Sequence, residues 1–308
     1  MSSADWFFKD AIEARDELTK RQEKAIRKSY NEWAREVREE ANRLSRIPGS
    51  QNEQRQMAEL YYQLRNASRQ LSAEINNEVN SNVNNMGSVV VRTNQRWLSS
   101  LGLSTNALDY KMSASKDSAI RSILSGNLYQ NGKPLSERVW NLADGNLKDI
   151  YSIIGRGIAL NQSPYDIAKQ LEKYLNPNQH LGWTVKQYTD ANGRIHIARI
   201  GNNQVDWKAQ RLARTMLQHS YQQMLVSLTK DNPFVIGYIW HADGANACEL
   251  CMDRDGQFYK AEELPLDHPN GQCDFEVAID EEKARNDLAG FYENPIEYPD
   301  IQRWIGED

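Results

Sequence analysis

The sequence predicts a mainly helical α+β protein, and three observations lead to this expectation. Apolar residues recur at helical spacing over most of residues 3–86, whereas short runs of β-favouring residues lie mainly in the C-terminal half. A Cys-x-x-Cys pair and a histidine lie among those runs. We therefore expect a long N-terminal helical hairpin, followed by an α+β domain that holds a small, zinc-stapled β element.

Length and composition suggest how the chain is divided. Its 308 residues are enough for two domains, or for one large domain with an arm. Only 40% of the residues are hydrophobic and the mean hydropathy is -0.75, which long solvated helices would explain. We expect an extended helical arm over residues 1–110, a second domain over 111–279 and a C-terminal docking tail over 280–308.

Charge and cysteine content argue against some functional classes. A formal net charge of -5 argues against a surface built as a whole to neutralise phosphates, although local contact with nucleic acid stays open. Three cysteines, two of them close together, favour metal ligation in a reducing compartment over a disulfide framework. The sequence has neither a signal-peptide pattern nor an apolar run of membrane-spanning length, so we expect synthesis in the cytoplasm and no membrane association.

Residues 3–86 have the spacing of two amphipathic helices, joined by a break at 47–50 where Pro48 and Gly49 occur. The apolar stripe of the first helix comprises Ile26, Tyr30, Trp33, Val37, Ala41 and Leu44. That of the second comprises Met57, Leu60, Leu64, Leu71, Ile75, Val79, Val83 and Met86. Each stripe is narrow, so the hairpin could complete its burial either against another protomer or partner, or against the rest of the chain.

The sequence between this hairpin and the next helix is less regular. The Asn-rich tract 76–85 consists of weak helix formers and indicates fraying or a bend. Val89–Val91 favour a strand, while the residues beyond Thr93 suit a helix. We expect a domain boundary near 104–112, after which helical spacing returns over 113–124.

Two further helices are expected in the centre of the chain. After a turn at 132–134, a stripe that should face the core follows Leu135, with an interruption at Asp144-Gly145. The stripe comprises Val139, Trp140, Leu147, Ile150, Tyr151, Ile154 and Ile158. Ser163 then serves as an N-cap, with Pro164 as the first helical residue, and this helix should end near Leu175.

The remaining expected elements are strands on either side of one long helix. Residues 183–200 alternate about an Asn-Gly pair within 190–193, which predicts a β-hairpin. A central helix is expected over 207–228, followed by a buried strand at 234–240. Short strands beside the cysteines are expected at 257–259 and 275–277.

All three cysteines and one of the five histidines occur in an order that suits a tetrahedral zinc site. Cys248 and Cys251 would supply two thiolates from one tight turn, and His268 and Cys273 would complete the set of four ligands. Four protein ligands leave no position for water, so the zinc would be structural and we assign no catalytic residue. The opposing interpretation is three buried free thiols and a solvated histidine. The polar turn residues around the cysteines argue against it, because a polar loop without a core of its own needs a cross-link such as a bound metal to stay ordered.

A different function for the same segment is that of an HNH-type nuclease, in which His268 would activate water beside a divalent ion. That chemistry requires further His or Asn ligands downstream, and only Asn270, Asn286 and Asn294 follow. A zinc-containing DNA-binding module is the related alternative. Among the other histidines, only His241 is close enough in sequence to substitute as a ligand.

Several motifs of the C-terminal half follow one another in a characteristic order. They are Trp240, Cys248-Glu249-Leu250-Cys251, Asp255-Gly256-Gln257-Phe258, and His268-Pro269 with Cys273. In this order and spacing they resemble the Mu F-like family of phage minor head, or head morphogenesis, proteins. Residues 153–171 and Ala213-Arg214-Thr215 are also similar to that family, so the resemblance covers roughly residues 115–280.

Two positions depart from the family pattern. Gly271 stands where the family has a further cysteine, which still leaves four ligands, and Met216 replaces a glutamate, which puts any role of that acidic group in doubt. The resemblance implies a structural, non-enzymatic minor capsid protein of a tailed phage, made in the host cytoplasm and located in the virion head. It also implies association with the portal protein, the major capsid protein or both during head assembly. Self-association through the arm, contact with packaged DNA, and a part in DNA packaging or ejection are left open as further expectations.

Overall fold

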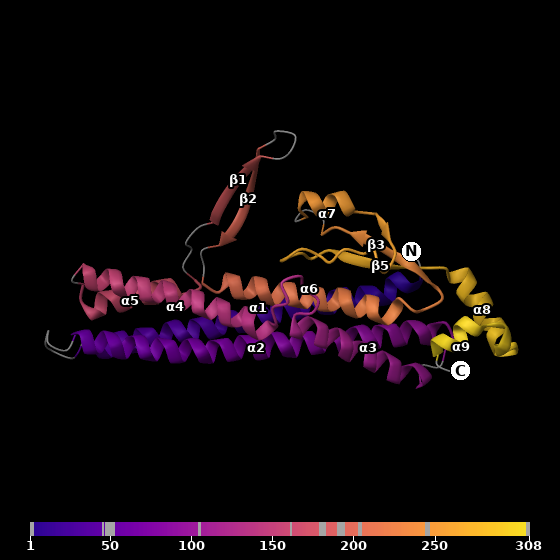
Figure 1. Cartoon of the computed structure of the whole chain (residues 1–308), viewed down its shortest axis with the longest axis horizontal. Helices are drawn as coiled ribbons and strands as arrows, with labels where there is room; N and C mark the ends of the chain where they lie inside the picture. The colour runs from indigo at the N-terminus through magenta and orange to yellow at the C-terminus, as the bar shows by residue number, and fades with distance from the viewer. Residues whose placement is uncertain are drawn as a thin grey trace. The chain divides into compact units, whose positions relative to one another are not determined.

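The computed structural model describes residues 3–44, 46, 53–103, 106–160, 162–178, 183–189, 195–202, 205–243 and 247–305. Within these residues the fold is mainly helical α+β, as predicted (Figure 1). The helices are α1 (Ser3–Leu44), α2 (Glu53–Ser100), α3 (Asn106–Ser125), α4 (Leu135–Ala159), α5 (Pro164–Leu175), α6 (Trp207–Thr229), α7 (Glu249–Arg254), α8 (Glu281–Glu293) and α9 (Pro299–Ile305), with a 3-10 turn, η3 (Pro295–Glu297). The strands are β1 (Trp183–Thr189), β2 (Ile195–Asn202), β3 (Val235–His241), β4 (Phe258–Tyr259) and β5 (Asp274–Ile279).

The chain forms two compact units, each built from segments that are distant in the sequence. The first unit contains Met1–Arg21, Val79–Pro134 and Ala213–Asp308, and the second contains Gln22–Glu78 and Leu135–Leu212. The three segments expected from the sequence, 1–110, 111–279 and 280–308, follow the order of the chain instead. Those boundaries remain a prediction.

Helices α1 and α2 pack against each other, as expected for the N-terminal hairpin. In the first unit the rings of Phe8 and Trp97 lie 6.1 Å apart, and Arg96 lies 3.4 Å from Asp10. In the second unit both helices line one shallow depression, which includes Trp33, Val37, Leu60 and Leu64. The break predicted at 47–50 lies outside the described residues.

The predicted apolar stripes of the hairpin are buried within the chain. The buried members are Ile26, Tyr30, Trp33, Val37, Met57, Leu60, Leu64, Leu71, Ile75, Val79, Val83 and Met86. The side chains of Ala41 and Leu44 are not described. For the buried members, packing onto the protein's own chain is the alternative that holds, while self-association of the arm remains a prediction.

Helix α2 is longer than the sequence predicted. It runs without interruption through the Asn-rich tract and through Val89–Val91 to Ser100, so the predictions of a frayed helix and of a strand were wrong. Val90, Trp97 and Leu98 are buried at helical spacing, and their packing outweighs the β-preference of valine. Gly87 permits a close approach, because a Cβ there would lie 3.0 Å from Met224 Cε of α6.

Helix α4 is also continuous, and no interruption occurs at Asp144-Gly145. The stripe predicted to face the core is buried at Val139, Ile150 and Ile154. Leu147 is half-buried. Trp140, Tyr151 and Ile158 are 51%, 65% and 47% exposed, so this part of the prediction was wrong. The reason is geometric, because successive residues of an α-helix point about 100° apart and the set spans two faces.

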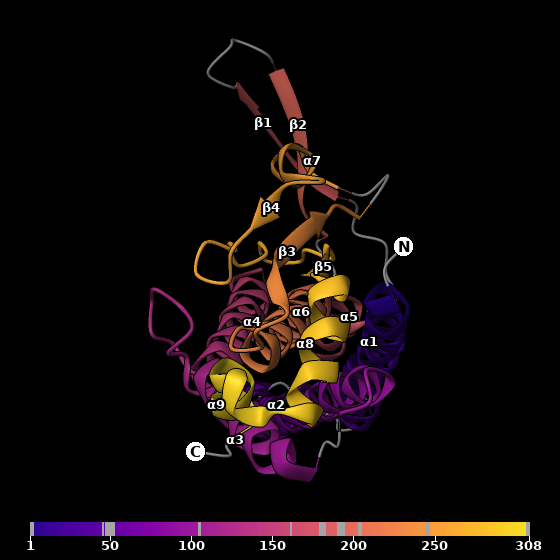
Figure 2. The same ribbon diagram turned by 90° about the vertical axis from the view of Figure 1, so that its right-hand side faces the viewer.

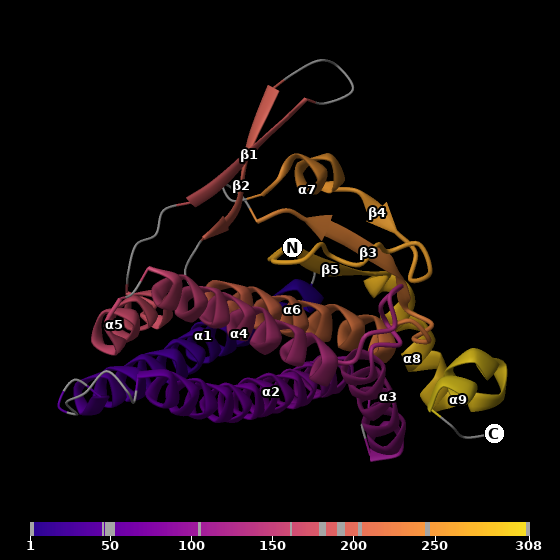
Figure 3. The same ribbon diagram turned by 60° about the vertical axis from the view of Figure 1, so that its left-hand side comes forward.

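A three-stranded antiparallel sheet lies in the first unit, with β3 between β4 and β5 (Figure 2). The predicted strands are confirmed, although β3 is buried on one face only: Tyr238 and Trp240 are fully buried, while Ile236 is 56% exposed. Helix α6 runs along the covered face (Figure 3), where the rings of Tyr221 and Phe275 stack 6.3 Å apart.

Two local predictions in the second unit are confirmed. Helix α5 begins at Pro164, and the side chain of Ser163 accepts a hydrogen bond from the Asp166 amide at 3.2 Å, which makes it the N-cap. Strands β1 and β2 form an antiparallel hairpin. The predicted Asn-Gly turn between them lies outside the described residues.

Helix α9 packs against other elements of the first unit. Trp304 and Ile305 are buried, the Trp304 ring lies edge-on to Phe234 at 6.0 Å, and Lys111 Nζ donates to the Trp304 carbonyl at 3.0 Å. Among the described helices, none combines the length and apolarity needed to cross a membrane.

Candidate metal centre

Helix α7 places two of the predicted ligands on one side of a short turn. Cys248 is the N-cap residue, and its carbonyl accepts a hydrogen bond from the Met252 amide at 3.0 Å. Cys251 follows less than one helical turn later and is buried, whereas Cys248 is exposed. Residues three apart on a helix lie on the same face, so both thiols point toward one place.

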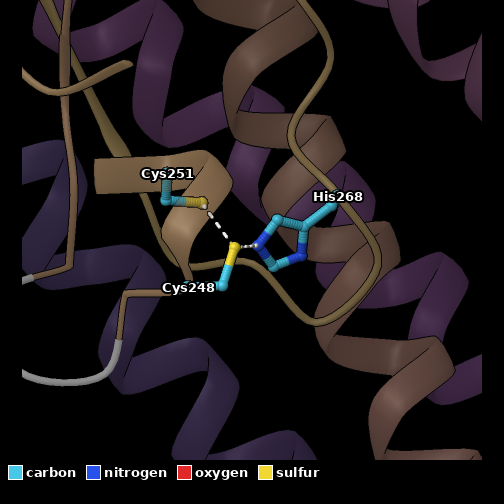
Figure 4. A group of neighbouring side chains, drawn as sticks. All are labelled: Cys248, Cys251 and His268. Carbon is cyan, nitrogen blue, oxygen red and sulfur yellow. Dashed lines mark hydrogen bonds between the residues drawn. The ribbon is translucent and has the colours of Figure 1, made fainter. Parts of the chain in front are cut away.

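The third predicted ligand meets these thiols from another segment. Cys248 Sγ lies 3.6 Å from Cys251 Sγ and 3.3 Å from His268 Nε2 (Figure 4). His268 Nδ1 lies 3.1 Å from the Pro269 carbonyl oxygen, so Nδ1 carries the proton and donates it there. With the proton on Nδ1, Nε2 is the ring nitrogen that faces Cys248 Sγ.

Cys273 joins the cluster through Cys251. The sulfur atoms of Cys251 and Cys273 and a carboxylate oxygen of Asp267 lie within 4.8 Å of one another, as do the ligand atoms of Cys248, Cys251 and His268. The two groups share Cys251. The structure therefore brings the four predicted residues together, adds Asp267, and forms a cluster that could bind a metal ion.

The two buried thiols favour their neutral form when no cation is present. Burial raises the pKa of Cys251, and its hydrogen-bonding neighbours Cys273 and Cys248 raise it further. Burial also raises the pKa of Cys273, against the opposing effects of Cys251, the Asp243 amide and the Trp240 indole. A coordinated metal cation reverses this balance, because it stabilises the thiolate directly.

The sheet and the turn after α7 pack against this helix. The Trp240 ring is fully buried, lies edge-on to Phe275 at 4.9 Å, and is covered by the Arg254 guanidinium at 5.0 Å. Gly256 has a φ of 73° and donates its amide to the Trp240 carbonyl at 2.8 Å. A positive φ suits glycine, so the Trp240 and Asp-Gly motifs have a common structural role in the turn that carries the cysteines.

The other residues considered from the sequence take different roles. His241 is exposed and its Nε2 lies 2.9 Å from Glu276 Oε2, and it belongs to neither candidate metal group among the described residues. The Asn270 side chain accepts a hydrogen bond from Arg214, and Asn294 donates to Glu297. The asparagines needed by a nuclease site therefore have other partners at two of the three positions.

Sequence reasoning missed Asp267. It directly precedes His268 and is only 2% exposed, although a polar Asp-His-Pro-Asn-Gly stretch would ordinarily be read as a solvated turn. The adjacent pair of an acidic residue and a predicted ligand was the available signal, but the direction of the carboxylate depends on residues far away in the sequence.

Comparison with known protein families, curated proteins and solved structures found no match to this chain. The resemblance to phage minor head proteins therefore remains a prediction from the motifs.

Proposed function

We propose that Cys248, Cys251, His268 and Cys273 bind one structural zinc ion. The observation that carries this proposal is the convergence of Cys248 Sγ on Cys251 Sγ at 3.6 Å and on His268 Nε2 at 3.3 Å. In a tetrahedral zinc site, with Zn–S about 2.3 Å and Zn–N about 2.0 Å, neighbouring ligand atoms lie about 3.5–3.8 Å apart. The distance between the two sulfur atoms falls in this range, and the sulfur–nitrogen distance is about 0.2 Å shorter. Cys273 lies within 4.8 Å of Cys251, so it would have to move closer to the other ligands when the ion binds.

The chemistry of the donors selects this kind of ion. Three sulfur atoms and one imidazole are soft or borderline donors, which favour zinc over magnesium or calcium, whose ligands are oxygens. Because four protein ligands fill a tetrahedral shell, no position is left at which the ion could activate water. The zinc would therefore stabilise the fold and would not catalyse a reaction.

Metal analysis of the purified protein tests the site. We expect about one zinc per chain, and much less after Cys251→Ser. Met252→Ser is the matched control, because Met252 is a 52% exposed neighbour on the same helix. Removing zinc that is present at 100 times its Kd should lower the free energy of unfolding by about 2.7 kcal/mol. Zinc removal should destabilise the first unit more than residues 22–78 of the hairpin. Protein that contains no zinc, or that melts identically with and without a chelator, would reject the site.

We further propose that the chain is a minor head protein of a tailed phage, with a structural part in head assembly. Support comes from the order of Trp240, the Cys-x-x-Cys pair, the Asp-Gly turn and the His-Pro pair in the sequence. The role of Trp240 and Gly256 in one turn gives that order a physical reason. On this proposal the protein associates with the portal, the major capsid protein or both, and is located in the virion head.

Purified phage particles test the proposal that the chain is a minor head protein. We expect the protein in purified heads of the phage that encodes it, and we expect it to co-purify with portal protein or major capsid protein. Its absence from both procapsids and virions would refute the assignment. Cleavage of duplex DNA in the presence of magnesium or manganese, abolished by His268→Ala, would instead establish the nuclease alternative.

A further inference from the structure

One face of α6 carries a row of buried polar side chains that holds the segment Pro265–Cys273. The row consists of Thr215, Gln218, His219 and Gln222, with exposures of 8%, 2%, 3% and 1%. The spacing of three, four and seven residues places all of them on one side of the helix. Burying a polar group is unfavourable unless it finds hydrogen-bond partners. Each member of the row has a partner in this loop, while Gln218 and His219 also contact Arg15 and Tyr129.

The hydrogen bonds of the row run along the backbone of that loop. Gln222 Nε2 donates to the Pro265 carbonyl at 2.7 Å, and Gln222 Oε1 accepts from the Asp267 amide at 3.0 Å. His219 Nε2 lies 2.9 Å from the Asp267 carbonyl oxygen. The loop is therefore fixed to α6 immediately before the predicted ligand His268.

The Asp267 carboxylate continues this network into the candidate metal centre. Oδ1 accepts from the His268 amide at 2.8 Å, and Oδ2 lies 3.3 Å from the Cys273 amide. Gln218 Nε2 donates to the same Oδ2 at 3.0 Å and to the Cys273 carbonyl at 2.5 Å. A single buried carboxylate thus holds the backbone of both ligand residues that the loop supplies.

This arrangement also explains Gly271. A Cβ at position 271 would lie 2.2 Å from Asp267 Oδ1, which is closer than real contacts allow. A cysteine, or any other side chain, would collide with the carboxylate at this position. Glycine leaves the space in which Asp267 reaches both amides.

We propose that Asp267 is a positioning residue for the metal site and that it is not a ligand. Its two oxygens already accept hydrogen bonds from three N–H groups, and coordination would require them to give up part of this bonding. The carboxylate and the α6 row keep His268 and Cys273 in the geometry for binding before any ion arrives. Such preorganisation raises affinity because less conformational freedom is lost on binding. The inference rests on the proposed metal site.

Asp267→Asn tests the proposal, because it keeps the size of the side chain but places an NH2 group against amide donors. The control is Asp253→Asn, which makes the same change of charge on the exposed surface of α7. For both variants, zinc affinity is measured by competition with a chelator, and the ligands are compared by the visible spectrum of the cobalt(II)-substituted protein. Amide hydrogen exchange at His268 and Cys273 is measured on the metal-free proteins.

We expect Asp267→Asn to keep the cobalt spectrum of the unmodified chain while its zinc affinity falls about 10–100-fold, with no change for Asp253→Asn. Faster exchange of the two amides should accompany the loss. An altered cobalt spectrum would make Asp267 a ligand, and unchanged zinc affinity would remove its positioning role; either result overturns the inference.

Two further outcomes remain decisive. If the unmodified chain binds no metal, the proposed zinc site fails, and only the hydrogen-exchange measurement still tests Asp267. Equal amide exchange in both variants would then show that Asp267 does not position the loop. Faster exchange in Asp267→Asn alone would show that it does. If Asp267→Asn does not fold, Gly271→Ala replaces it, because its Cβ must displace the same carboxylate. Zinc affinity equal to that of the unmodified chain would then refute the proposal.

Discussion

Replacing Arg15 by methionine removes a buried positive charge from the first unit. Arg15 is only 4% exposed, and its NH1 group lies 2.6 Å from Asp274 Oδ1, 3.0 Å from Gln218 Oε1 and 3.3 Å from the Cys273 carbonyl. Methionine fills most of the volume of the aliphatic stem. The expected loss is therefore one of charge and hydrogen bonds, with little change in packing.

The magnitude follows from the acceptors that are left behind. Removing one partner of a buried ion pair costs about 3–5 kcal/mol, because the remaining charge stays buried without compensation. The Asp274 side chain is 32% exposed, so water replaces part of the lost interaction. We expect Arg15→Met to lower the free energy of unfolding by about 2–4 kcal/mol, and the melting temperature by roughly 5–15 °C.

The loss should depend on pH in a defined direction. Burial raises the pKa of Asp274, the charge and hydrogen bond of Arg15 lower it in part, and the like charges of Asp16 and Asp243 raise it again. Without Arg15 the pKa of Asp274 in the folded protein rises further. An acid whose folded pKa is raised contributes most to stability below its unfolded value of about 3.9, and that contribution is lost as pH rises through the folded pKa. The deficit of Arg15→Met should therefore be smaller at pH 5.5 than at pH 8.

Urea unfolding at both pH values, with zinc held constant, measures this prediction. Arg21→Met is the control, because Arg21 is an exposed cation on the same helix within the same unit. A stability of Arg15→Met within 0.5 kcal/mol of that control, or a deficit that grows as pH falls, would refute the reasoning about the buried pair.

Three other substitutions test local features. Trp304→Ala should destabilise the first unit by about 3–5 kcal/mol, because it removes a 5% exposed indole from its contact with Phe234. A change of less than 1 kcal/mol in the free energy of unfolding, measured in urea, would show that the tail contributes little. Ser163→Ala should cost about 1 kcal/mol by leaving the Asp166 amide without its cap, measured as faster hydrogen exchange in the first turn of α5; unchanged exchange would count against the cap. Gly256→Ala should cost about 1–2 kcal/mol from its positive φ alone, since no atom lies within 4 Å of the added Cβ; a stability equal to that of the unmodified chain would contradict this origin.

The features that could be predicted from the sequence are those decided by short-range chemistry. Ser163 and Pro164 form a helix start whatever surrounds them, and the structure has α5 begin there. The spacing of Cys248 and Cys251 likewise indicates a two-thiol turn before any packing is known. In both cases the interacting groups lie within a few residues of each other.

The features that escaped prediction depend on partners far away in the sequence. Val89–Val91 are helical because the helix buries Val90, a packing effect that intrinsic preference does not contain. Asp267 acquires its role from Gln218 and Gln222, which lie 49 and 45 residues earlier. Gly271 illustrates the same limit, because in the sequence it marks a missing cysteine and in the fold it makes room for a carboxylate.

The unequal exposure of the three thiols has a kinetic consequence. Cys251 and Cys273 are each 1% exposed, whereas Cys248 is exposed and His268 is partly so. Among the described ligand residues, an alkylating reagent therefore meets the Cys248 thiol before either buried thiol, and a chelator can approach from the side of Cys248 and His268. On the proposed zinc site, exchange of the ion would start at these two accessible ligands, while the two buried thiols hold it from the inside.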